Sequence, residues 1–254
     1  MDEAGSHPSP PVLTWPGGPR EVRLPAGEVH VWSARLDAKP EQIQAGWQVL
    51  SSDERERADR FRFSQDRLHF VAARVILRAL VGRYLEIPGT AARFRYGPFG
   101  KPSLDAGHGS DLRFNVAHSG EVALYAFARL REVGLDVEAV RSARVLAGVS
   151  DSSFSEAERQ ALTALSPERR GLATLGLWTR KEAYLKALGS GLQQDLASFE
   201  VSVPPAAPAL LRAPALQADA KTWGLHDLQP APDFVGALCV EGGSEVRAWS
   251  WNPA

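Results

Sequence analysis

Two long helical segments constrain this chain more than any other feature. In Gln65–Tyr84 apolar residues recur every three or four positions, as on the buried face of a helix, and a second long helix is predicted over Leu172–Leu188. Both are set among short runs typical of strands. Because strands and helices do not alternate strictly, the sequence predicts an α+β fold rather than a doubly wound parallel sheet.

The remaining elements distribute over both halves of the 254-residue chain. The predicted strands are Glu28–Leu36, Phe94–Tyr96, Phe114–Ala117, Val122–Ala128, Val133–Val140, Ser198–Val203, Trp223–Leu228, Phe234–Val240 and Val246–Trp251. Shorter helices are predicted after the capping-box pattern Ser51–Glu54 and over Ser155–Leu165. We expect an irregular tail over residues 1–27, an N-terminal α+β half over 28–131 and a C-terminal half over 132–254, compatible with a duplicated architecture.

Composition excludes several classes of function. The formal net charge is -1, so bulk electrostatics do not predict a nucleic-acid partner. The single cysteine, Cys239, cannot form an internal disulfide and is predicted to be a small buried residue in a reducing compartment. No stretch approaches the ~20 apolar residues that span a bilayer, and the first residues do not resemble a signal peptide. We therefore expect a cytoplasmic protein that does not enter membranes.

Asp136 and Glu138 are the first candidates for chemistry. On a strand, residues two apart point to the same face, while Leu135 and Val137 point to the other face and into the core. Two convergent carboxylates suit Mg²⁺, which takes a few protein oxygens and leaves its other positions to water and phosphate. The alternative is a strand with one solvated acidic face.

A row of side chains on the second long helix is the next candidate. Trp178, Glu182 and Lys186 are spaced four residues apart and share one helix face, with Lys181 beside them. A solvated face with a Glu182–Lys186 ion pair is the alternative. Trp178 favours a half-buried row instead, because a large aromatic side chain gains little on a purely solvated surface. Such a row suits the wall of a cleft.

His118 and Ser119 do not form a hydrolase site. Adjacent residues of an extended chain point to opposite faces, and the chain has no G-x-S-x-G elbow. At the tip of a hairpin, both side chains can instead donate a hydrogen bond to a phosphate, and Gly120 lets the backbone approach closely. The stiff turn Gly97–Pro102 likewise presents Lys101.

Together these motifs resemble the Sfp-type 4'-phosphopantetheinyl transferases. The segments that carry the resemblance occur in order as Gly100-Lys-Pro102, Phe114-Asn-Val-Ala-His-Ser-Gly120, Gly134-Leu-Asp-Val-Glu138, Phe154-Ser-Glu-Ala-Glu158 and Trp178-Thr-Arg-Lys-Glu-Ala-Tyr-Leu-Lys186. The pairing of G-x-D-x-E with W-x-x-K-E-x-x-x-K is the specific part. The resemblance implies a monomeric pseudo-dimer of two similar α+β halves, with coenzyme A (CoA) bound in the cleft between them.

The resemblance also implies roles for individual residues. Asp136, Glu138 and Glu182 would hold Mg²⁺, with Mn²⁺ as the alternative ion. The CoA contacts would come from Lys181 and Lys186 at the phosphates, Lys101 and His118 at the nucleotide end, Ser119 beside them, and Arg57 at the 3'-phosphate. The chain departs from its relatives at Ala117, where serine is frequent, which removes one hydroxyl from the phosphate site.

The implied reaction is attack of a carrier-protein serine on the β-phosphorus of CoA, which releases adenosine 3',5'-bisphosphate (3',5'-ADP). Asp136, Glu182 and Lys186 would be the catalytic residues, with Glu182 as the first candidate for general base and a metal-bound water as the competing one. Two alternatives remain: a metal-dependent pyrophosphohydrolase that acts on CoA or a nucleotide, and a non-catalytic module that binds carrier proteins. The sequence does not distinguish carriers of fatty acid, polyketide and nonribosomal peptide biosynthesis.

Overall fold

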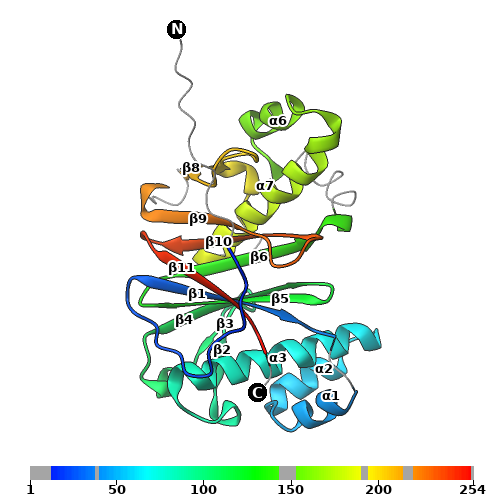
Figure 1. Ribbon diagram of the computed structural model, residues 1–254, viewed down its shortest axis with the longest axis vertical. Coiled ribbons are helices and arrows are strands. Elements are labelled where there is room, and N and C mark those ends of the chain that lie inside the picture. Colours follow the sequence, from blue (N-terminus) through cyan, green and yellow to red (C-terminus); the bar gives the residue numbers. More distant parts are fainter. Residues whose placement is uncertain (1–12, 38–39, 143–152, 190–193, 214–219, 253–254) are drawn as a thin grey trace.

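Two sheets lie face to face between two long helices in the computed structural model (Figure 1). The structure describes residues 13–37, 40–142, 153–189, 194–213 and 220–252. From one end of the molecule to the other, the layers are helix α3 (Ser64–Leu85), a four-stranded sheet, a three-stranded sheet and helix α7 (Pro167–Leu188). The predicted α+β fold is confirmed.

The four-stranded sheet has the order β11-β1-β5-β4. Its strands are β1 (Glu28–Arg35), β4 (Leu112–Ser119), β5 (Val122–Arg129) and β11 (Glu245–Ser250). Strand β11 runs parallel to β1, whereas β1, β5 and β4 are antiparallel to their neighbours. The last strand of the chain therefore crosses the expected boundary at residue 131 and completes the sheet of the N-terminal half.

The three-stranded sheet has the order β6-β10-β9 and is antiparallel. Its strands are β6 (Val133–Ala139), β9 (Trp223–Leu228) and β10 (Phe234–Glu241). Two short hairpins flank the sheets: β2 (Phe94–Tyr96) with β3 (Pro102–Leu104), and β7 (Glu200–Val201) with β8 (Leu210–Arg212). The strand predicted over Ser198–Val203 is thus shorter in the structure, because a 3₁₀ turn occupies Leu196–Ser198.

Three shorter helices complete the described part: α1 (Pro40–Trp47), α2 (Ser52–Asp59) and α6 (Glu156–Thr163). Both α2 and α6 begin with the capping box, since Glu54 accepts a hydrogen bond from the backbone N–H of Ser51 and Glu158 accepts one from Ser155. Helix α7 begins more than a turn before the predicted start at Leu172. Proline is well suited to the first turn of a helix, which has no need of its N–H, and Pro167 stands there.

Three apolar clusters hold the layers together. One lies between α3 and the four-stranded sheet around Trp32 and Leu77, and another lies between α7 and the three-stranded sheet around Leu177 and Tyr184. The third, which includes Leu124, fills the space between the two sheets. As predicted, Cys239 is buried, and burial raises the pKa of its thiol. Each half thus packs its own 22-residue helix on the outer face of its sheet.

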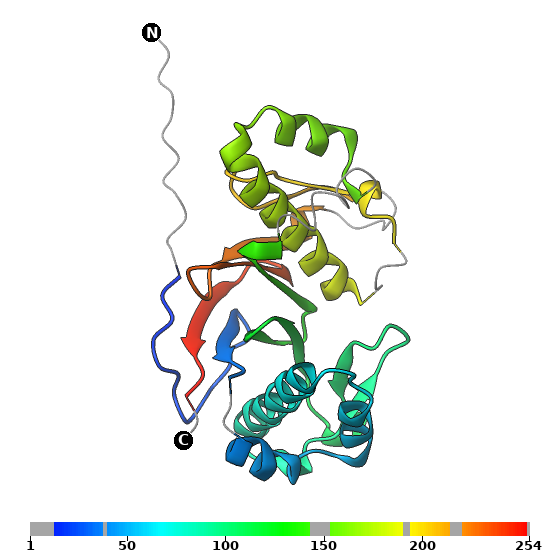
Figure 2. The same cartoon turned by 90° about the vertical axis from the view of Figure 1, so that its right-hand side faces the viewer.

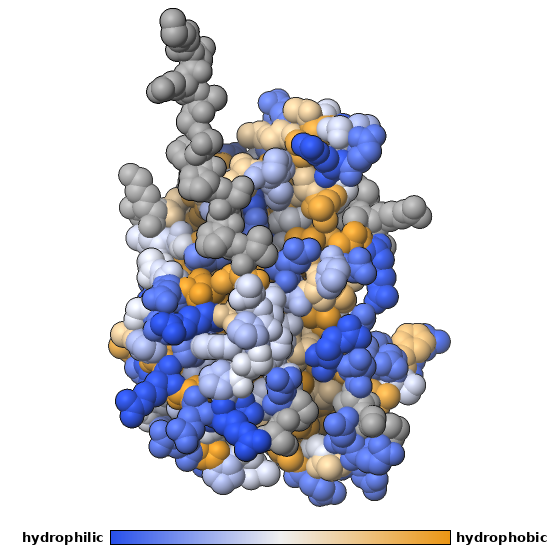
Figure 3. All heavy atoms as spheres, viewed as in Figure 1, coloured by the Kyte–Doolittle hydropathy of each residue, from blue (hydrophilic) through white to orange (hydrophobic). Residues whose placement is uncertain are grey.

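The described part of the N-terminal segment, residues 13–27, is irregular but packed. The indole N–H of Trp15 donates to the carbonyl of Gln229 (2.9 Å), and Gly17 bridges to Ser250 beside the edge strand β11. Leu24 is buried in the core beneath α3. No helix among the described residues is long and apolar enough to cross a membrane. The face shown in Figure 3 is largely hydrophilic, with small hydrophobic patches.

Candidate active site

A pocket of about 580 Å³ lies where the two halves meet, between the loop that joins β2 to β3 and the C-terminal half of α7. Figure 2 shows this loop reaching toward the end of α7. The lining residues are Phe99, Gly100, Lys101, Pro102, Asn115, Val116, Glu182, Leu185, Lys186 and Gly189. The β2–β3 loop and the two α7 residues Glu182 and Lys186 therefore line the same cavity.

Gly134 lets α7 sit directly on β6 beneath this pocket. A Cβ atom at position 134 would lie 2.1 Å from the carbonyl oxygen of Ala183 and 2.2 Å from the backbone nitrogen of Ala187. No side chain fits in that space, so the first residue of the G-x-D-x-E motif is a packing requirement. Its consequence is that Asp136, two residues along β6, reaches the α7 side chain of Lys186.

Asp136 and Glu182, both buried, and the half-buried Lys186 form the polar centre of the site. The ammonium of Lys186 donates to Oδ1 of Asp136 at 2.6 Å. Burial raises the pKa of Asp136 against the effect of Lys186. Burial also raises the pKa of Glu182 to about 7; the charges of Asp136 and Glu138 act in the same direction, and Lys186 opposes them. The predicted alternative, a solvated Glu182–Lys186 pair, does not describe this arrangement.

Two oxygens of this centre are buried without a hydrogen-bond partner, Oδ2 of Asp136 and Oε1 of Glu182. A buried acceptor without a hydrogen-bond partner is costly. Carboxylate oxygens are also the ligands that a hard divalent cation prefers, so a bound cation would satisfy both. These residues therefore fit a Mg²⁺ ion. With the side chains as placed, no three carboxylate, histidine or cysteine side chains in the described residues come close enough to hold a metal together.

The third predicted metal ligand, Glu138, is hydrogen-bonded to strand β4 of the other sheet. Leu135 and Val137 are buried between the sheets, as the alternation predicts, so Asp136 and Glu138 share the other face of β6. Oε2 of Glu138 accepts a hydrogen bond from the Ser119 hydroxyl at 3.0 Å. Ser119 also accepts from the backbone N–H of Ala139. In this arrangement Ser119 orients Glu138 rather than facing a phosphate.

His118 and Ser119, predicted to lie in the hairpin turn, are instead the last two residues of strand β4. The turn itself is Gly120–Glu121, and Gly120 has φ +52°, a conformation that favours glycine. Although His118 is solvent-exposed, crowding by protein atoms lowers the pKa of its imidazole, and the positive charges of Lys186, His69 and Arg57 lower it further. Basic residues of both halves therefore act electrostatically on His118.

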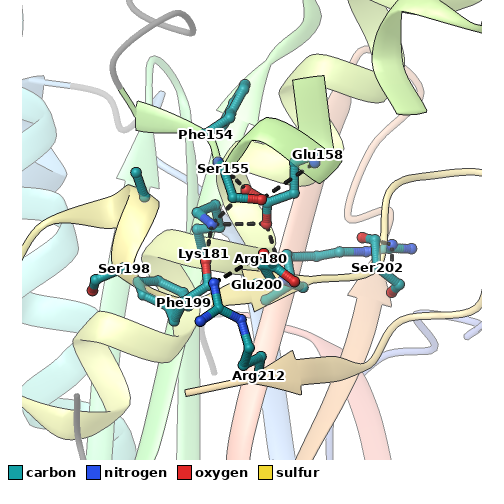
Figure 4. Close-up of polar contacts among 12 residues, drawn as sticks. Phe154, Ser155, Glu158, Arg180, Lys181, Ser198, Phe199, Glu200, Ser202 and Arg212 are labelled. Carbon is teal, nitrogen blue, oxygen red and sulfur yellow. Dashed lines mark hydrogen bonds and ion pairs between the residues drawn. The ribbon is translucent and has the colours of Figure 1, made fainter. Parts of the chain in front are cut away.

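Lys181 does not belong to the site, which corrects its predicted contact with CoA phosphates. Its ammonium donates to both carboxylate oxygens of Glu158 (2.7 and 2.8 Å) and to the carbonyl of Phe199 (2.7 Å), and it is fully buried. Figure 4 shows this buried ion pair between α6 and α7. Lys181 and Lys186 are five positions apart in the sequence, which turns the two side chains roughly 140° apart around the helix.

Lys101 and Arg57 are placed differently from each other. Lys101 lines the pocket, but its ammonium donates to Glu132, to the carbonyl of Val133 and to that of Ala187. Arg57 is exposed on α2 and stacks over Phe70, at 5.4 Å from the ring centroid. It lines a separate cavity of about 570 Å³ with Tyr96, so the structure does not bring it into the pocket of Lys186.

Sequence reasoning assigned no role to Asn115, which helps to build the site, or to Glu158, which holds Lys181 away from it. Asn115 is buried, lines the pocket and accepts the backbone N–H of Leu135 through Oδ1 (2.8 Å), which ties β4 to β6. Its signal was its place in the Phe114–Gly120 motif. Glu158 is the buried partner of Lys181, and its signal was the capping box, where Ser155 and Glu158 stand three residues apart.

Comparison with known proteins identifies the family. The model of the 4'-phosphopantetheinyl transferase superfamily matches residues 132–239, and that of the N-terminal part of 4'-phosphopantetheinyl transferase matches residues 34–129. The 4'-phosphopantetheinyl transferase HetI of Nostoc is 36% identical over 240 residues, covering 94% of this chain and 98% of HetI. The transferase Sfp of Bacillus subtilis is 28% identical over 152 residues, 60% of this chain and 66% of Sfp.

Among solved structures, a holo-(acyl-carrier-protein) synthase of Bacillus anthracis in complex with CoA (3',5'-ADP) is 23% identical, with a TM-score of 0.37. The match covers 44% of this chain and 96% of that synthase. The two family matches, and the similarity to HetI over nearly the full length of both chains, agree with the site geometry. The chain belongs to the 4'-phosphopantetheinyl transferase family and is an enzyme of that class.

Proposed function

We propose that this enzyme transfers the 4'-phosphopantetheine group of CoA to a serine of an acyl or peptidyl carrier protein and acts as a cytoplasmic monomer. The observation that carries the proposal is the polar centre at the pocket, where Lys186 donates to Asp136 at 2.6 Å and the buried Glu182 has an oxygen without a hydrogen-bond partner. An anionic pyrophosphate needs cationic partners in such a place, and Lys186 supplies one.

The carboxylates support a divalent cation, Mg²⁺ or Mn²⁺. Asp136 and Glu182 would hold it through their unsatisfied oxygens, and Glu138, on the same face of β6, would join them. The bound ion would neutralise charge on the pyrophosphate oxygens of CoA. Ser119 would keep Glu138 in place through its hydrogen bond.

In the reaction, the serine oxygen forms a bond to the β-phosphorus as the bond from that phosphorus to the bridging oxygen breaks, and 3',5'-ADP leaves with that oxygen. Lys186 stabilises negative charge that builds on the phosphoryl oxygens. Glu182 would accept the serine proton, since it lines the pocket beside Lys186 and one of its carboxylate oxygens has no hydrogen-bond partner. His118 and Arg57 are assigned to the nucleotide end of CoA: the exposed imidazole of His118 would donate a hydrogen bond, and the Arg57 guanidinium would pair with the 3'-phosphate from its own cavity.

The test is intact-mass spectrometry of an apo carrier protein incubated with the enzyme, CoA and Mg²⁺. Matched controls are an EDTA sample and a carrier whose acceptor serine is replaced by alanine. We expect a gain of one phosphopantetheine that both controls abolish. No gain on several carriers, with CoA intact, would favour a binding module. No gain with CoA consumed would favour the pyrophosphohydrolase.

A further inference from the structure

Lys101 connects the two halves at the mouth of the pocket. It belongs to the loop between β2 and β3, yet its ammonium donates to three acceptors beyond residue 131: Oε2 of Glu132 at 3.1 Å, the carbonyl of Val133 at 3.4 Å and the carbonyl of Ala187 at 3.0 Å. A lysine ammonium has three N–H groups. All three are therefore engaged within the protein, and none is left for a phosphate.

The hydrogen bond from Lys101 to the carbonyl of Ala187 caps the C-terminal end of α7. The helix ends at Leu188, so the carbonyl of Ala187 is one of the last four and has no partner within the helix. Gly189 follows with φ +69°, and its Cβ position lies 3.6 Å from Cδ of Lys101. The lysine stem thus crosses the helix terminus, and its positive charge faces the negative end of the helix dipole.

The two elements that Lys101 joins are the two walls of the pocket. Phe99 and Gly100 belong to the loop, and Glu182 and Lys186 lie on the last turns of α7. The distance between these walls depends on where the loop is attached to the helix end. The side chain that makes the attachment is half-buried, and burial lowers the pKa of Lys101 while Glu132 opposes that effect.

We propose that Lys101 is a positioning residue that holds the β2–β3 loop against the end of α7 and so sets the width of the CoA pocket, instead of binding a CoA phosphate itself. The proposal rests on the proposed function, since it takes CoA as the ligand of the pocket. We name the contact of Lys101 with Glu132, Val133 and Ala187 the Lys101 bridge.

Four variants separate positioning from direct contact: Lys101→Met, Glu132→Gln, the double variant, and Arg113→Met as the control. Arg113 also contacts Glu132, at 3.4 Å, but takes no part in the Lys101 bridge. The measurements are kcat and KM for CoA, and the dissociation constant of 3',5'-ADP by calorimetry. We expect Lys101→Met to raise KM and the dissociation constant about tenfold with kcat nearly unchanged, and Glu132→Gln, which leaves the two carbonyl contacts in place, to raise both by a smaller factor.

The double variant gives the sharper outcome. Because Lys101→Met already removes the contact that Glu132→Gln weakens, the double variant should be no worse than Lys101→Met, and Arg113→Met should behave like the wild type. Direct phosphate contact predicts otherwise. Glu132→Gln would then free the lysine and leave KM unchanged or lower, while Lys101→Met alone would weaken binding. That pattern would overturn the proposal.

A second measurement does not depend on CoA. Within the loop, Gly97 donates its backbone N–H to Lys101 and Gly100 donates to Gly97. Hydrogen–deuterium exchange of residues 97–101 in the ligand-free protein should be faster in Lys101→Met than in the wild type or in Arg113→Met. Equal exchange in all three would refute the Lys101 bridge. A wild type that binds neither CoA nor 3',5'-ADP would instead refute the proposed function, and the exchange result would still decide the bridge.

Discussion

Removing the ammonium of Lys181 tests whether this lysine stabilises the fold or binds CoA. Lys181 is 0% exposed and Glu158 2% exposed, and Glu158 additionally accepts backbone N–H groups of Ser155 and Val201. In Lys181→Met, the carboxylate of Glu158 stays buried and keeps only these two backbone N–H donors. Breaking a buried ion pair from one side costs about 3–5 kcal/mol. For a chain of this size the melting temperature should fall by roughly 6–20 °C.

Differential scanning calorimetry and steady-state kinetics on the same preparations give the answer. The control is Arg212→Met, which breaks the exposed pair between Arg212 and Glu200 and should cost less than ~1 kcal/mol. Below its melting temperature, Lys181→Met should keep the wild-type KM for CoA, because Lys181 faces away from Lys186. A variant with unchanged melting temperature and a raised KM would refute this reasoning and restore Lys181 to the CoA site.

Three further predictions concern the site and the N-terminal half. Glu182→Gln should lower kcat by roughly 10²–10⁴-fold, and near-wild-type turnover in this variant, with loss in Asp136→Asn, would exclude Glu182 as the base. Ser119→Ala should weaken Mn²⁺ binding about 10- to 100-fold in an electron paramagnetic resonance titration; unchanged affinity would remove Ser119 from the metal site. Burial acts to raise the pKa of Glu54, but its two arginine partners lower it below 4.5, so its stabilisation is complete above pH 4.5 and is lost as the pH falls further. Melting temperatures from pH 7 to pH 3 should therefore fall less steeply in Glu54→Gln than in the wild type, and equal slopes would contradict this.

Local patterns predicted the elements well because their causes are local. Helix α3 was predicted as Gln65–Tyr84 and spans Ser64–Leu85, since its apolar periodicity belongs to that segment alone. The capping boxes likewise need only residues three positions apart. The start of α7 was missed because periodicity fades in its polar first turn, where Pro167 was the available signal.

Pairing and side-chain partners could not be predicted in the same way. The alternating pattern of β11 indicates a strand but carries no information about its neighbour β1, which lies at the other end of the chain. The sequence brought Asp136, Glu182 and Lys186 into one hypothesis, and the structure places them together. It could not show that Lys181 turns toward Glu158, because both sides of α7 are buried and either could hold a cation.

The central claim is that the acceptor in this pocket is a carrier serine and not water. The most direct measurement is the ratio of 3',5'-ADP released to phosphopantetheine attached, followed in one reaction with limiting apo carrier protein. The account predicts a ratio of one and no 3',5'-ADP when the carrier is omitted. Release of 3',5'-ADP that continues after the carrier is consumed, or proceeds without it, would contradict the account and identify a pyrophosphohydrolase.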